Sequence, residues 1–149
     1  MYRPRVIPVV LINEHGESVK SIQFNKRIYL GDPVNTVSLF NSLQVDELIL
    51  LNIDSRKEKF KIDYDLLIDI AQEAKMPFAI GGGVNSIDEI RKILSLGAEK
   101  VVLSKSAIEN PEFLKEAVDQ FGSSSITVRL DVKKNFFGTQ TVQIHQKKS

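Results

Sequence analysis

The stretch Pro77-Phe78-Ala79-Ile80-Gly81-Gly82-Gly83 decides the fold class of this chain. Its apolar residues form a short run without polar alternation, which is typical of a strand buried on both faces of a parallel sheet. Ser86 follows the glycines and has Glu89 three positions beyond it, the pattern of a capping box at the start of a helix. Buried strand, glycine turn and capped helix together make one strand–helix unit.

The same unit recurs in both directions along the chain. The sequence predicts further buried strands at residues 6–12, 48–53, 100–104 and 125–131, and a short one at 141–145. It predicts helices that begin at Asp32-Pro33, Asp63 and Asn110-Pro111, where capping side chains or first-turn prolines occur. Alternating residues 17–24 predict an exposed hairpin after the first strand. Crossovers of this length keep the main strands parallel.

Two fold classes fit this order of elements, a doubly wound sheet and a (β/α)₈ barrel. A barrel needs about 250 residues, so the 149 residues here would supply about half of one. Such a half is either a truncated product or a unit completed by another chain. An open parallel sheet leaves strand edges that proteins normally cover, and we therefore expect truncation.

Composition excludes several classes of protein. Apolar residues make up 42% and charged residues 26%, as in an ordinary globular domain. The net charge of +1 predicts no broad field for nucleic acid or an anionic membrane. The chain has no cysteine and only two histidines, so we expect no disulfide, metal or organic cofactor. The apolar run at 6–12 is too short to span a bilayer, which favours a cytoplasmic protein.

Polar residues follow two neighbouring strands where their carboxyl ends should meet. The glycines at 81–83 would let free backbone N–H groups approach a phosphate, although a tight turn explains them equally well. Ser104-Lys105-Ser106 ends the next strand, where hydroxyls and an ammonium could complete an anion site or merely cap the following segment. Together the two loops favour a phosphate site made of Gly82, Gly83, Ser104 and Lys105.

Asp131 closes the fifth predicted strand and is the candidate general acid or base, with a loop-capping role as the alternative. Asn52 ends the second strand and should also face the mouth, where it can only form hydrogen bonds. Arg5, Glu47 and Lys100 lie at the opposite ends of strands one, two and four. Their spacing alone favours a cluster of salt bridges at the bottom of the barrel that stabilises the fold.

Several segments in register resemble one family. The resemblance covers nearly the whole chain except about the last ten residues, and it rests on residues 5–8, Gly31-Asp32-Pro33, residues 45–48, 78–84, 97–101 and 107–111. These match the HisF cyclase subunit of imidazole glycerol phosphate synthase in order and spacing. The resemblance implies a (β/α)₈ barrel, of which residues 1–149 would be the N-terminal half with about four strand–helix units plus strand five.

The resemblance to this family also implies a function and roles for individual residues. The resemblance implies ammonia conducted through the barrel core from a HisH-type glutaminase docked at the bottom face, with Arg5, Glu47 and Lys100 as a charged gate whose fourth member would lie beyond Ser149. It implies substrate phosphate near Gly82, Gly83, Ser104 and Lys105, although the family usually has Asn-Thr in the last loop. Lys20 falls on the lysine of a mobile loop that closes over substrate.

Leu11 is the most informative departure from the family. The cyclase uses aspartates at the ends of strands one and five; Asp131 matches the second, but the first position is Leu11. Asn52 likewise replaces a usual aspartate. Loss of one proton-transfer group commonly costs about 10²–10⁴ in rate. The opening residues 5–12 resemble instead a HisF-like branch associated with acetamidino modification of surface sugars.

Three functions follow from this sequence. The first is an ammonia-dependent lyase or synthase subunit that serves amidination of a surface sugar, as in lipopolysaccharide or a flagellar glycan. The second is a genuine cyclase of histidine biosynthesis, for which a carboxylate at Leu11 should be needed. The third is an inactive half-barrel fragment. The ligand would be a phosphorylated or sugar small molecule.

Overall fold

The computed structural model describes residues 3–22, 26–55, 62–136 and 138–142. Five strands run parallel in one sheet: β1 (Val9–Ile12), β4 (Leu48–Asn52), β5 (Phe78–Gly81), β6 (Lys100–Leu103) and β7 (Ile126–Val128). The antiparallel hairpin of β2 (Ser18–Ile22) and β3 (Lys26–Gly31) joins this sheet at β1, which gives the order β3-β2-β1-β4-β5-β6-β7. The hairpin expected after the first strand is confirmed in the described residues, and residues 23 and 24 of its expected span lie outside them.

Side-chain caps set the beginnings of the helices. Four helices begin after Asp32, Asp63, Ser86 and Asn110, whose side chains accept hydrogen bonds from the first turn; these are α1 (Pro33–Ser42), α2 (Tyr64–Glu73), α3 (Ile87–Ser95) and α5 (Pro111–Phe121). The carboxylate of Glu89 accepts from the backbone N–H of Asn85, one residue before the expected capping-box partner. A fifth helix, α4 (Lys105–Glu109), precedes α5 and was not expected from the sequence.

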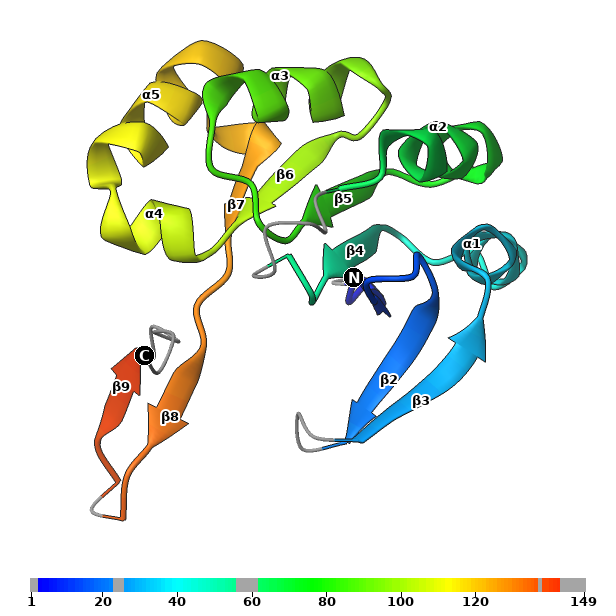
Figure 1. Cartoon of the computed structure of the whole chain (residues 1–149), viewed down its shortest axis with the longest axis horizontal. Coiled ribbons are helices and arrows are strands. Elements are labelled where there is room, and N and C mark those ends of the chain that lie inside the picture. Colours follow the sequence, from blue (N-terminus) through cyan, green and yellow to red (C-terminus); the bar gives the residue numbers. More distant parts are fainter. Residues whose placement is uncertain (1–2, 23–25, 56–61, 137, 143–149) are drawn as a thin grey trace.

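The sheet is curved, and the helices lie along its convex side (Figure 1). The large core fills the space between helices and sheet and includes Leu48, Leu50, Val101 and Leu103. The alternate residues of the same strands face the concave side, where Leu51, Ala79 and Val102 form a small separate cluster. A doubly wound sheet would carry helices on both faces. The fold is therefore a partial (β/α)₈ barrel.

The first strand differs from its prediction. β1 covers only Val9–Ile12, and burial alternates along it, with Val10 at 6% exposure and Val9 at 52%. Only the outer side of β1 packs against helices, whereas its inner side faces the concave surface of the sheet.

The fifth strand also differs. A short 3₁₀ turn (Ser123–Ser125) precedes β7, which ends at Val128 rather than at the expected residue 131. A second antiparallel hairpin follows, made of β8 (Val132–Lys134) and β9 (Gln140–Val142). The strand expected at 141–145 thus begins one residue earlier, and its last three residues, like the expected tail 146–149, lie outside the described part of the chain.

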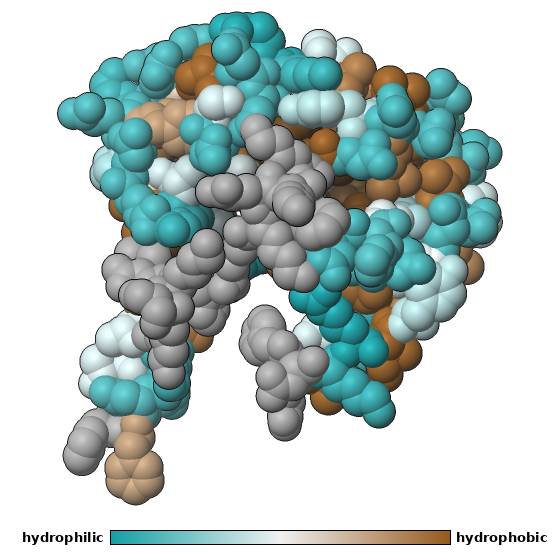
Figure 2. Space-filling view, viewed as in Figure 1, coloured by the Kyte–Doolittle hydropathy of each residue, from teal (hydrophilic) through white to brown (hydrophobic). Residues whose placement is uncertain are grey.

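The surface is mostly hydrophilic over the helices in the view of Figure 2, and apolar residues show along the side of the β2–β3 hairpin. Exposed apolar side chains of that hairpin are Ile22, Ile28, Tyr29 and Leu30. In the part of the chain that the structure describes, no helix has the length and apolar character needed to cross a membrane.

Candidate functional site

The carboxyl ends of the five parallel strands form the mouth of the partial barrel. The register places Leu11, Leu51, Gly81, Val102 and Thr127 side by side across the sheet. Leu11, Leu51 and Val102 belong to the inner cluster, so this level of the mouth is apolar. Leu11 packs within that cluster at the position where the resemblance leads one to expect an aspartate. β1 itself therefore contributes no carboxylate at this level of the mouth.

The glycine turn after β5 is packed tightly against the end of β4. A Cβ atom on Gly82 would lie 2.1 Å from the carbonyl oxygen of Asn52, and one on Gly83 would lie 2.5 Å from Cβ of Ser55. Both glycines also have positive φ, at 108° and 80°. Strand packing and backbone conformation thus require glycine here. The tight-turn alternative is supported, and phosphate binding at Gly82 and Gly83 stays a prediction.

The loop after β6 is joined directly to this glycine turn. Ser106 donates a hydrogen bond of 2.7 Å from its hydroxyl to the carbonyl oxygen of Val84. Contrary to the prediction of a loop, Lys105 and Ser106 lie within α4, with the ammonium of Lys105 3.6 Å from Glu109. Ser104 stands just before the helix, and its side chain makes no capping hydrogen bond. The structure therefore brings the two segments of the expected phosphate site together.

Asp131 lies beyond the fifth strand rather than in it. β7 ends at Val128, and the ladder closes with a 2.8 Å bond from the N–H of Arg129 to the carbonyl oxygen of Leu103. The carboxylate of Asp131 accepts a 2.9 Å hydrogen bond from the guanidinium of Arg129. The candidate acid thus stands three residues past the end of β7, not at the end of the strand as predicted, and it carries a cationic partner.

Lys20 does not lie in a loop. It stands within β2, paired with Ile28 of β3, and its side chain is exposed on the hairpin. Among the described residues no contact joins it to the glycine turn or to Asp131. Asn52 was expected to face the mouth, yet it lies on the same face of β4 as Leu48 and Leu50, which pack in the outer core. Its side-chain oxygen accepts instead from the N–H of Asp54.

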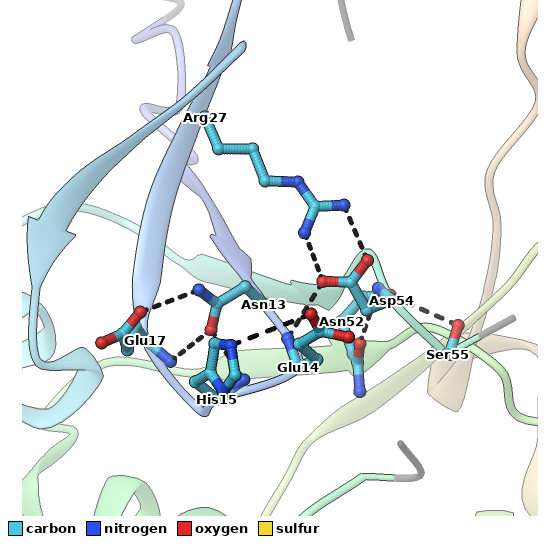
Figure 3. Close-up of polar contacts among 8 residues, drawn as sticks. All are labelled: Asn13, Glu14, His15, Glu17, Arg27, Asn52, Asp54 and Ser55. Atoms are coloured by element: carbon cyan, nitrogen blue, oxygen red, sulfur yellow. Dashed lines mark hydrogen bonds and ion pairs between the residues drawn. The ribbon is translucent and has the colours of Figure 1, made fainter. Parts of the chain in front are cut away.

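Asp54 is the functional-site candidate that sequence reasoning missed. It is 6% exposed and forms a two-point ion pair with Arg27 of β3, and it also accepts from the N–H of Glu14 at 3.0 Å (Figure 3). The hydrogen bond to Asp54 raises the pKa of Arg27 above its ordinary value, against the lowering effect of burial. This cluster fixes the β2–β3 hairpin to the end of β4. The sequence could have indicated Asp54, because an acidic residue directly after a buried strand is a common site residue. No pattern around Arg27 indicates that it would pair with Asp54.

The opposite end of the sheet carries the three residues that spacing had grouped together. Glu47 is 5% exposed and accepts hydrogen bonds of 2.8 Å from both Arg5 and Lys100. The bond to Glu47 is the main cause that raises the pKa of Lys100 above 10.5; burial opposes it, and Glu99 adds to it. The predicted convergence of Arg5, Glu47 and Lys100 is confirmed. In the described part of the chain, no three acidic, histidine or cysteine side chains cluster to hold a metal ion.

The fold and the site define a half-barrel with polar groups at both ends of its strands. Comparison with known proteins shows to which family this half-barrel belongs. The family model described as "Histidine biosynthesis protein" matches residues 5–149. The chain belongs to this family and, by its curated relatives, is a HisF-family protein.

Three relatives illustrate the similarity. The chain is 44% identical over 140 residues to the "Putative imidazole glycerol phosphate synthase subunit hisF3" of Vibrio vulnificus, covering 94% of this chain and 54% of that protein. It is 42% identical over 146 residues to a Leptospira borgpetersenii protein with the corresponding "HisF" description, covering 97% and 57%. The "Imidazole glycerol phosphate synthase subunit HisF" of Thermococcus onnurineus is 38% identical over 135 residues, covering 91% and 53%. The chain thus spans about half the length of these relatives, and its fold is the N-terminal half of the barrel.

Proposed function

We propose that this chain, as one N-terminal half-barrel domain of residues 1–149, serves a HisF-like synthase that takes ammonia from a HisH-type glutaminase in the cytoplasm. The product step we assign is amidination of a surface sugar rather than closure of the imidazole ring. One observation carries the distinction: Leu11 occupies the inner end of β1 within an apolar cluster. Leucine cannot exchange a proton, so the acid–base pair needed for ring closure is incomplete.

The cluster at the amino-terminal ends of the strands supports the ammonia route. Arg5, Glu47 and Lys100 close the bottom of the half-barrel through two short ion pairs. A glutaminase bound there would deliver neutral ammonia past these side chains toward the mouth. The role of the cluster as a gate is part of the proposal, as is the binding of a phosphorylated or sugar ligand by Gly82, Gly83, Ser104 and Lys105, with Asp131 and Lys20 as the groups that act on it.

The competing function is the histidine-pathway cyclase, which the description of the Thermococcus onnurineus relative favours. The test is ammonia-dependent cyclisation by a barrel completed with the C-terminal half of the Vibrio vulnificus relative. We expect turnover at least about 10² below that of a cyclase with both aspartates, and Leu11→Asp should recover part of it. Leu51→Asp, an acid placed in the same inner cluster from β4, is the matched control and should recover nothing. Efficient turnover with Leu11 in place would contradict the proposal.

The glutaminase interaction has its own test. Binding of a HisH-type glutaminase to this chain, measured by calorimetry, should be weakened by charge changes at the bottom face, as in Arg5→Gln. It should be insensitive to Lys133→Gln on β8, far along the chain from that face. If both variants bind the glutaminase with equal affinity, the bottom face is not its binding surface.

A further inference from the structure

Arg129 stands on the inner side of the fifth parallel strand. Ile126 of β7 packs against the outer core, whereas Thr127 pairs with Val102 of the inner cluster. The N–H of Arg129 donates to the carbonyl oxygen of Leu103, so the extended backbone and its alternation continue past Val128. Arg129 therefore shares the side of Thr127, which faces the concave surface. The buried cluster on this face consists of Leu51, Ala79 and Val102, so an arginine beside it is unusual.

The register brings Arg129 to the level of the expected phosphate site. Leu103 pairs with Val128, so the next residues, Ser104 and Arg129, are neighbours on adjacent strands. Parallel strands lie about 4.8 Å apart, a distance that an arginine side chain spans easily. The ladder between β5 and β6 ends at Gly81 and Val102. Beyond it, the hydrogen bond from Ser106 to Val84 holds the glycine turn to the segment that Ser104 begins. The glycine turn, the serine and the guanidinium thus border one part of the mouth.

The guanidinium of Arg129 is incompletely satisfied. It has five N–H donors, and Asp131 accepts one hydrogen bond from Nη2 at 2.9 Å. The Nε atom is buried and has no hydrogen-bond partner among the described residues. The side chain as a whole is 41% exposed, so its outer nitrogens remain accessible from the mouth. Buried donors without partners are rare and often mark functional positions, and the planar arginine fork suits the oxygens of phosphate.

We propose that Arg129 is a phosphate-binding residue of the mouth, acting with Gly82, Gly83 and Ser104 on the same group. This inference rests on the phosphate site of the proposed function and adds a second cation to Lys105, whose ammonium lies 3.6 Å from Glu109. Leu11 stands where the resemblance implies an acid, and the guanidinium of Arg129 offsets the charge of Asp131. A mouth with less negative charge accepts an anionic ligand more readily.

The test is titration of the 149-residue chain with inorganic phosphate, followed by NMR on the backbone amides of Gly82, Gly83 and Ser104. We expect these amides to shift in the unmodified chain, and Arg129→Gln to weaken the affinity by about 10-fold or more, since a charged hydrogen bond is lost. Arg91→Gln is the matched control, because Arg91 pairs with Asp88 on the exposed side of α3. It should leave the affinity unchanged.

The outcomes separate the two claims. If phosphate shifts none of these amides in the unmodified chain, the phosphate site itself is wrong. If phosphate binds and Arg129→Gln binds equally well, the site stands and the role of Arg129 is wrong. Should Arg129→Gln fail to fold, the Nε–H signal of Arg129 in the unmodified chain gives a direct reading. That signal must move with added phosphate, and a static signal overturns the inference.

Discussion

Arg27 of β3 and Asp54, just after β4, form a two-point ion pair, with Nη2 of the arginine 2.6 Å from Oδ1 of the aspartate. The carboxylate is almost fully buried, whereas the guanidinium is 42% exposed. The pair ties β3 of the hairpin to the segment after β4, in addition to the ladder that joins β2 to β1 (Figure 3). Since the hairpin carries Lys20, this pair also determines where that lysine stands relative to the mouth.

Asp54→Asn tests the strength of this attachment. Removal of the charge leaves Arg27 beside a neutral amide, and we expect the free energy of unfolding to fall by about 1–2 kcal/mol, less than for a fully buried pair because the guanidinium is partly solvated. Hydrogen exchange of the β2 and β3 amides should accelerate. Asp88→Asn removes the acid of a similar but exposed pair and should change stability by less than about 0.5 kcal/mol. Equal effects would contradict this role for Asp54.

Glu47→Gln tests the cluster at the opposite end. Arg5 and Lys100 would then face each other across a neutral side chain, and we expect a loss of about 1–2 kcal/mol in urea unfolding, limited by the exposure of Arg5. Glu99→Gln is a stringent control, because Glu99 contacts the same ammonium at 3.3 Å from an exposed position. A loss as large for Glu99→Gln would show that burial of Glu47 is immaterial.

The raised pKa of Lys100 predicts a pH dependence of stability. A group whose pKa is higher in the folded state stabilises the fold fully below its unfolded value, here 10.5, and loses that effect as the pH rises through the folded value. The stability advantage of the unmodified chain over Lys100→Met should therefore shrink above pH 10.5. A constant advantage across this range would refute the linkage.

Gly82→Ala separates backbone conformation from close packing. The new Cβ would stand 2.1 Å from the carbonyl oxygen of Asn52, so β4 and the turn must move apart. We expect a loss of more than about 3 kcal/mol in the free energy of unfolding, in the range of severe overpacking. Gly138 also has a positive φ, but its nearest neighbour would be 3.7 Å away. Gly138→Ala should cost about 1 kcal/mol, the strain of the backbone alone. Similar losses of stability in the two variants would show that close packing against Asn52 does not matter.

Local chemistry in the sequence accounts for most of the framework. The caps at Asp32, Asp63 and Asn110 and the buried runs at β4, β5 and β6 are short-range signals, and each formed the expected element. The convergence of Arg5, Glu47 and Lys100 followed from their places at the same ends of parallel strands. What depends on contacts distant in sequence was missed. Asp54 lies 27 positions beyond Arg27 in the sequence, a separation that no local pattern reports. α4 interrupts a stretch interpreted as a loop.

Alternation within a strand was the second source of error. Asn52 was expected in the mouth because it is polar at a strand end, but its parity with Leu48 and Leu50 puts it on the outer side. Arg129 was passed over although its parity with Thr127 turns it inward. Counting positions from the neighbouring buried residues, rather than judging polarity, would have placed both side chains correctly.

The hydrogen bond between Ser106 and Val84 makes neighbours of two segments that would otherwise be independent. The turn after β5 and the short helix after β6 cannot separate without first breaking it. A ligand that needs more room between them must therefore displace a serine hydroxyl, and a substitution in one segment will alter the shape that the other presents.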